Sequence, residues 1–138
     1  EMCIRDSDYT APYPGIIPLL QELRRRGVKM GIVSNKFDEG VKALAAKFFG
    51  GLIDYAQGVS NTVKKKPAPD AVFALIAAQN AATEPNIYVG DSEVDIETAQ
   101  NAGLPCISVS WGFRTRNALL QHGAQTIIDR PEELLEHI

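Results

Sequence analysis

The chain has 138 residues, of which 45% are hydrophobic and 22% are charged, and its formal net charge at pH 7 is −3. This length and apolar content suit one ordinary domain with a buried core. The small acidic excess argues against partners such as nucleic acid or a membrane surface, and no apolar run approaches the ~20 residues of a membrane-spanning helix. The two cysteines, Cys3 and Cys106, form neither a metal-binding pattern nor a disulfide framework. A reducing, cytoplasmic location is therefore expected.

Helical patterns alternate with apolar strand patterns along the whole chain. In chain order the predicted elements are helix 14–27, strand 28–34, helix 37–50, strand 55–59, helix 69–80, strand 86–90, helix 92–103, strand 105–111, helix 115–123, strand 126–129 and helix 131–138. Continuous apolar strands between helices are typical of a parallel sheet that is covered on both faces. The sequence therefore predicts an α/β fold with a Rossmann-like, doubly wound parallel sheet.

Polar residues follow the first predicted strand, where an open α/β sheet binds its ligands. Ser34 and Asn35 come at the end of strand 28–34, directly before helix 37–50. The hydroxyl of Ser34 and the free N–H groups of that helix could together hold an anion. Alternatively, the two residues only cap a helix or a turn.

An acidic segment, Asp91-Ser92-Glu93-Val94-Asp95, follows strand 86–90. Clustered carboxylates repel one another unless a cation lies among them, and Mg²⁺ is a hard cation that one or two carboxylates can bind. The alternative is an acidic first turn of the next helix, which the helix dipole favours. This alternative suits Glu93, which is expected to face solvent. It suits Asp91 less well, because an unpaired carboxylate at a buried strand end is costly.

Three lysines precede helix 69–80. Lys64 and Lys65 are expected to be solvated, as lysine runs usually are. Lys66 differs because Pro67 and Pro69 stiffen the chain beside it. A lysine fixed in this way could face an anion or the acidic segment that follows strand 86–90.

Taken together, SNK (34–36), KPAPD (66–70) and GDSEVD (90–95) resemble motifs two, three and four of the haloacid dehalogenase-like hydrolases, in this order. Within that family, the segments 12–36 and 111–138 resemble the phosphoglycolate phosphatase-like branch. The resemblance covers roughly residues 10 to 138. It implies a partial core domain at 10–138, after a non-native or remnant segment at 1–9.

The resemblance implies a Mg²⁺-dependent phosphatase, that is, a phosphoric monoester hydrolase, acting on a small phosphorylated metabolite of the phosphoglycolate type. By position, Ser34 would hydrogen-bond the phosphoryl group, and Asn35 would line the same loop. Lys66 would be catalytic and phosphate-binding, neutralising charge on the nucleophile and the phosphoryl group. Asp91 would bind the metal, and Asp95 would support the metal site or orient Lys66. In this family an aspartate nucleophile forms an aspartyl-phosphate, which water hydrolyses.

The nucleophile of this family belongs to motif one, and DSDYT at residues 6–10 matches its spelling. The preceding EMCIR is a poor central strand, and the branch's helical cap has no counterpart between DSDYT and Ser34. We therefore expect that the match is a coincidence, that the core lacks its first strand and cap, and that the chain alone is inactive. The alternatives are a non-catalytic remnant that binds phosphate and Mg²⁺, and a capless minimal phosphatase that uses Asp6 and Asp8.

A missing first strand would have a structural consequence. In the family's sheet that strand lies between the strands of motifs two and four. Without it, two parallel strands lose a common neighbour, and their backbone groups need other partners. We therefore expect the chain to be less stable than its composition suggests. These features make no prediction of the oligomeric state.

Overall fold

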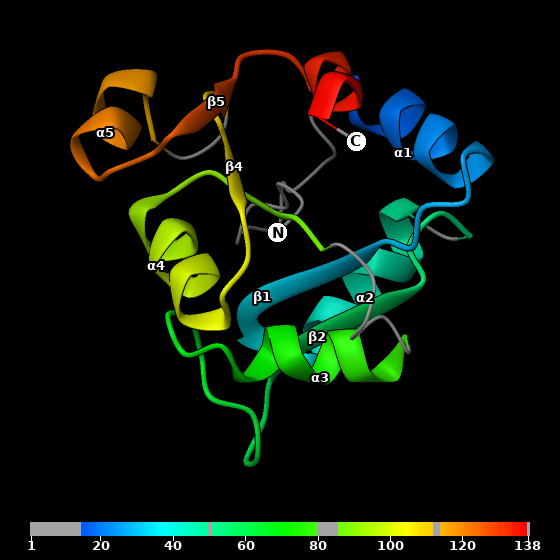
Figure 1. Ribbon diagram of the computed structural model, residues 1–138. Helices are drawn as coiled ribbons and strands as arrows, with labels where there is room; N and C mark the ends of the chain where they lie inside the picture. Colours follow the sequence, from blue (N-terminus) through cyan, green and yellow to red (C-terminus); the bar gives the residue numbers. More distant parts are fainter. Residues whose placement is uncertain (1–14, 50, 80–85, 112–113, 138) are drawn as a thin grey trace.

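The computed structural model describes residues 15–49, 51–79, 86–111 and 114–137. Helices and strands alternate along these residues, as the sequence predicts (Figure 1). In order they are α1 (Ile16–Arg25), β1 (Gly31–Phe37), α2 (Asp38–Phe49), β2 (Tyr55–Val59), α3 (Asp70–Ala78), β3 (Tyr88–Gly90), α4 (Glu93–Ala102), β4 (Cys106–Val109), α5 (Arg116–Gln121), β5 (Thr126–Ile128) and the 3₁₀ helix η1 (Pro131–His137).

The described strands form two parallel sheets. One contains β1 and β2, and the other has the order β3-β4-β5. The predicted α/β fold with parallel strands is therefore confirmed. The single doubly wound sheet is not formed by the described strands, because none of them hydrogen-bonds to both β1 and β3. The strand that carries SNK, β1, and the strand that precedes the acidic segment, β3, therefore belong to different sheets.

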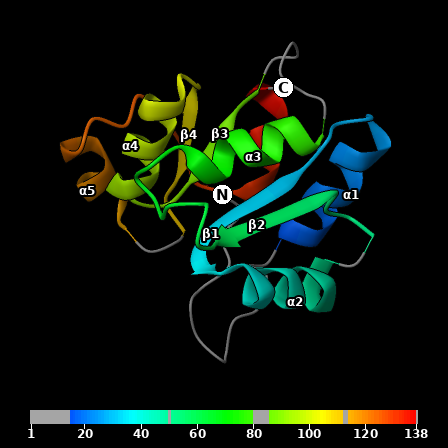
Figure 2. The same ribbon diagram turned by 90° about the horizontal axis from the view of Figure 1, so that it is seen from below.

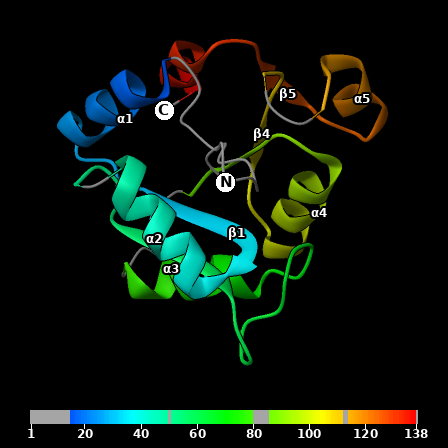
Figure 3. The same cartoon turned by 180° about the vertical axis from the view of Figure 1, so that it is seen from behind.

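Helices pack against both sheets. Figure 2 shows α2 and α3 on opposite faces of the β1–β2 pair, and both helices contact these strands. Helix α4 packs against β3 and β4, and α1 lies beside η1, as Figure 3 shows from behind. None of the helices in the described ranges is long and apolar enough to cross a membrane.

One apolar core joins the two sheets. It contains Ile32 of β1 together with Val109 of β4 and Ile128 of β5, all of them buried. Helix α1 contributes a stripe with the spacing of one helical face, namely Ile16, Leu19, Leu20 and Leu23. The two sheets are thus held together by side-chain packing, with no strand pairing between them among the described residues.

Strand β1 begins and ends three residues later than predicted. The backbone N–H of Met30 donates to a carboxylate oxygen of Asp54 at 2.8 Å, so the residues before Gly31 are tied to a side chain outside the strand ladder. At the other end, the pairing with β2 shifts register between Val33 and Phe37. Ser34 therefore lies within the irregular end of the strand and does not follow it.

Candidate functional site

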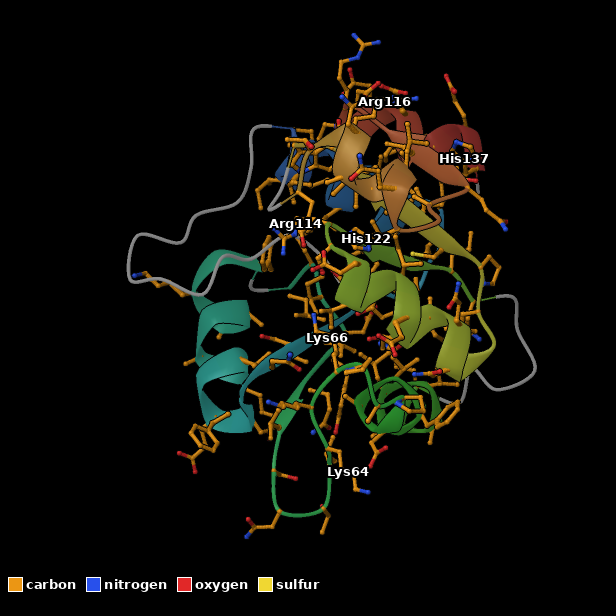
Figure 4. The ribbon with its side chains drawn as sticks, turned by 90° about the vertical axis from the view of Figure 1, so that its left-hand side faces the viewer. Lys64, Lys66, Arg114, Arg116, His122 and His137 are labelled. Carbon is orange, nitrogen blue, oxygen red and sulfur yellow. The ribbon has the colours of Figure 1, made fainter. Side chains whose placement is uncertain are left out.

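Lys66 forms a buried ion pair with Asp95. In Figure 4 Lys66 lies in the interior between β1 and α4, and the residue is 9% exposed. Its Nζ donates to Oδ1 of Asp95 at 2.9 Å, and Asp95 is 1% exposed. Lys64 and Lys65 are exposed, as predicted. A charge this deeply buried is costly unless it is paired, so each member of this pair depends on the other.

The carboxylate of Asp95 accepts four hydrogen bonds. Oδ1 accepts from Lys66 and, at 2.9 Å, from the hydroxyl of Tyr88. Oδ2 accepts from the backbone N–H of Asp91 and from the hydroxyl of Ser92, both at 3.0 Å. Ser92 also caps α4, because its Oγ accepts from the backbone N–H of Asp95. The turn after β3 is therefore built around this one carboxylate.

The environment keeps Asp95 ionised and Tyr88 protonated. Burial opposes the ionisation of Asp95, but the charge of Lys66 and its hydrogen bond outweigh burial and hold the pKa of Asp95 below its usual value. Burial, followed by the negative charge of Asp95, raises the pKa of the Tyr88 hydroxyl. At neutral pH the site thus holds a carboxylate that accepts and a phenol that donates.

Strand β1 meets the Lys66 loop through Asn35. The side-chain Oδ1 of Asn35 accepts from the backbone N–H of Lys66 at 2.7 Å. Ser34, the preceding residue, is 7% exposed. Residues from β1, from the loop before α3 and from the turn after β3 are therefore brought together, although 31 positions separate Asn35 from Lys66.

Asp91 is the candidate magnesium ligand among the described residues. Asp91 is half-buried at the end of β3, and a carboxylate there suits Mg²⁺. Asp95 cannot readily join it, because both of its oxygens already accept two hydrogen bonds. Across the described ranges no group of three or more His, Cys, Asp or Glu side chains could hold a metal ion. Mg²⁺ usually keeps several waters and is held through one or two carboxylates, so Asp91 is the described residue that suits it best.

Two contacts beside the predicted site residues are not anticipated by the sequence analysis. Tyr88 was part of an apolar strand pattern, and nothing in that pattern indicates where its hydroxyl points. Glu93 was expected to face solvent, but Arg114 donates two hydrogen bonds to its carboxylate, each at 2.9 Å. This contact lowers the pKa of Glu93. Arg114 also donates its backbone N–H to the carbonyl of Asp91 at 3.1 Å, which ties the loop after β4 to the site.

The motif-one candidates cannot be placed in this site. Asp6 and Asp8 lie outside the described residues, as does the predicted boundary between residues 9 and 10. Their roles and that boundary stay predictions. The roles of Ser34, Asn35, Lys66, Asp91 and Asp95 likewise stay predictions.

The chain resembles known proteins over most of its length. The family profile described as haloacid dehalogenase-like hydrolase matches residues 4–109. A phosphoglycolate phosphatase of Rhodobacter capsulatus is 42% identical over 118 residues, which are 82% of this chain and 52% of that protein. A phosphoglycolate phosphatase of Pseudomonas syringae is 28% identical over 93% of this chain and 47% of that protein. The chain thus spans about half the length of the curated relatives it matches.

Solved structures agree with this comparison. The crystal structure of a candidate phosphoglycolate phosphatase from Lactobacillus delbrueckii subsp. bulgaricus has a TM-score of 0.91 and is 42% identical, and the match covers 94% of this chain and 54% of that one. The fold of this chain therefore matches about half of that longer protein.

Proposed function

The chain belongs to the haloacid dehalogenase-like hydrolases, and from this premise we propose that it supplies motifs two to four of a phosphatase. The nucleophile would come from a segment outside the described residues. The reaction would be hydrolysis of a phosphate monoester through an aspartyl-phosphate. In this proposal the chain by itself binds phosphate but has no catalytic activity.

The buried pair of Lys66 and Asp95 is the observation that carries this proposal. A lysine fixed at 2.9 Å from a carboxylate in the interior presents its charge in a defined place. Preorganised charge of this kind acts more strongly on a phosphoryl group than a solvated lysine does, because little reorganisation is needed. Lys64 and Lys65, which are exposed, lack this property.

Each predicted residue has a role in the proposal. Lys66 would neutralise charge on the nucleophile and on the phosphoryl group, and Asp95 would orient it. Ser34 would donate its hydroxyl to a phosphoryl oxygen, and Asn35 would hold the Lys66 loop through the 2.7 Å bond to its backbone. Asp91 would be one ligand of Mg²⁺, which would screen negative charge when bound. Waters and further oxygen atoms would complete its coordination.

The proposed substrate is a small phosphorylated metabolite of the phosphoglycolate type. Support comes from the two relatives above, which carry the name phosphoglycolate phosphatase. A non-catalytic protein that binds phosphate and Mg²⁺ is the second candidate. The division of the described strands into two sheets favours it for the chain taken alone, since none of the described strands pairs with both β1 and β3.

The test is Mg²⁺-dependent hydrolysis of an aryl phosphate by the purified chain, measured beside the Asp6→Asn and Lys66→Met variants. We expect no turnover by any of the three. We also expect the wild-type chain to bind inorganic phosphate, and Lys66→Met to bind it at least about tenfold more weakly, as loss of a charged hydrogen bond predicts.

Two outcomes would change this proposal. Turnover by the wild-type chain that Asp6→Asn abolishes would make DSDYT a working motif one and the chain a capless phosphatase. Phosphate affinity that is equal in the wild-type chain and in Lys66→Met would contradict the phosphate-binding role of Lys66. Circular dichroism of each variant controls for loss of folding.

A further inference from the structure

The hydroxyl of Tyr88 reaches the same carboxylate oxygen that holds Lys66. Both groups donate to Oδ1 of Asp95, each at 2.9 Å. Tyr88 is 4% exposed, and its hydrogen bond to Asp95 is buried. Buried hydrogen bonds of this kind are costly to break, because the separated groups find no ready replacement partner.

Strand β3 is shaped for this contact. Side chains alternate along a strand, so Tyr88 and Gly90 share one face. A Cβ atom on Gly90 would lie only 2.2 Å from Cβ of Asp95. The absence of a side chain at Gly90 thus lets α4 bring Asp95 against the strand, within reach of the Tyr88 hydroxyl.

The ring of Tyr88 is held independently of its hydroxyl. It belongs to a second apolar cluster, which also contains Val33 of β1, Val72 of α3 and Ala99 of α4. Because the ring packs against residues of these three elements, the position of the hydroxyl does not depend on its hydrogen bond to Asp95 alone. A hydroxyl that is fixed in this way can orient the carboxylate.

We propose that Tyr88 is a positioning residue, which holds Asp95 and through it the ammonium of Lys66 in the orientation needed to bind a phosphoryl group. Two donors on each carboxylate oxygen fix the plane of the Asp95 carboxylate. Without the Tyr88 hydroxyl, Oδ1 would accept from Lys66 alone, and the pair could rotate together. This inference rests on the proposed function, because it assumes that Lys66 faces a phosphoryl group.

The test compares Tyr88→Phe with a matched control, Tyr55→Phe. Tyr88→Phe keeps the packed ring and removes only the hydroxyl. Tyr55 also carries a partly buried hydroxyl on a strand, but that hydroxyl donates to Gln57 at 3.4 Å, in the other sheet. Both variants are studied as the full 138-residue chain, in a stabilising osmolyte that keeps a weakened variant folded.

Two readouts separate a positioning role of Tyr88 from a purely structural one. The first is the hydrogen-exchange rate of the Lys66 ammonium group by ¹H–¹⁵N NMR, with the signal assigned by its loss in Lys66→Arg. The second is the affinity for inorganic phosphate. We expect Tyr88→Phe to raise the exchange rate and to weaken phosphate binding, each by about tenfold, as loss of one hydrogen bond to a charged group predicts. Tyr55→Phe should change neither.

A purely structural role would give a different result. Tyr88→Phe would then lower the urea midpoint but leave the exchange rate and the phosphate affinity at their wild-type values, and this outcome would overturn the inference. If the wild-type chain binds no phosphate at all, the proposed phosphate site fails. The ammonium exchange rate still decides the role of Tyr88 in that case, so the two failures are distinguishable.

Discussion

Among single residues, Lys66 and Asp95 stand out because their ion pair is buried, with side chains that are 8% and 1% exposed. Other ion pairs among the described residues are more exposed, for example Arg116 with Asp129, whose side chains are 51% and 55% exposed. Exposed pairs contribute little because water screens them. A buried pair is different, since the loss of one partner leaves the other charge without compensation.

Asp95→Asn should therefore lower the free energy of unfolding by about 3–5 kcal/mol, the usual cost of breaking a buried pair. Urea denaturation at pH 7 measures this loss. The double variant Lys66→Met/Asp95→Asn removes both charges and should recover most of it. Asp129→Asn, the exposed control, should cost less than about 1 kcal/mol. A loss in Asp95→Asn that is no greater than in Asp129→Asn would contradict the importance of the buried pair.

At the scale of elements, the close approach of α4 to β3 depends on Gly90. The sequence shows a glycine at the end of a strand, but it does not show that Asp95 occupies the space beside it. Gly31 on β1 offers a comparison, because a Cβ there would lie 2.3 Å from a terminal methyl carbon of Leu75. A methyl group at the end of a flexible side chain can move, whereas Cβ of Asp95 is fixed to the helix backbone.

Gly90→Ala should destabilise the chain by about 2–3 kcal/mol, at the upper end of the range for overpacking. Gly31→Ala should cost less, because Leu75 can change its rotamer. Gly40→Ala lies in α2 with open space around it and should stabilise the chain by up to about 1 kcal/mol through helix propensity. Urea midpoints of the three variants check this order. An equal cost at Gly90 and Gly31 would refute the argument from the Asp95 contact.

At the scale of the whole molecule, the two sheets share a core but no strand ladder among the described residues. The predicted cause is a missing first strand between β1 and β3. Backbone groups at strand edges need partners, and a parallel strand inserted between these two would supply them on both of its sides. The stability of the chain should then depend on what lies beyond the described residues.

A longer version that carries a complete first strand should be more stable by about 2 kcal/mol or more, since each hydrogen bond gained contributes about 1 kcal/mol. The measurement is urea denaturation of both proteins, with the m-value as a second readout of the surface buried. A control with the same added residues in scrambled order separates strand pairing from added length. Equal stability of all three would show that no strand belongs there.

The order and type of the elements could be predicted from the sequence, because hydrophobic periodicity is local, and the motifs identified Ser34, Asn35, Lys66, Asp91 and Asp95 as candidate site residues. The alternation of helices and strands follows the prediction from α1 to η1. Which of these residues touch depends on long-range packing, which local patterns do not encode. Lys66 and Asp95 are 29 positions apart, and their contact depends on how α4 sits on β3.

The same reason explains what sequence reasoning missed. The hydroxyl of Tyr88 and the pairing of Arg114 with Glu93 depend on side-chain directions that no periodic pattern encodes. The end of β1 was placed wrongly because its register with β2 shifts after Val33, and a register shift depends on the partner strand. Local hydrophobic patterns thus predict the helices and strands of this protein, whereas contacts between distant residues determine the geometry of its site.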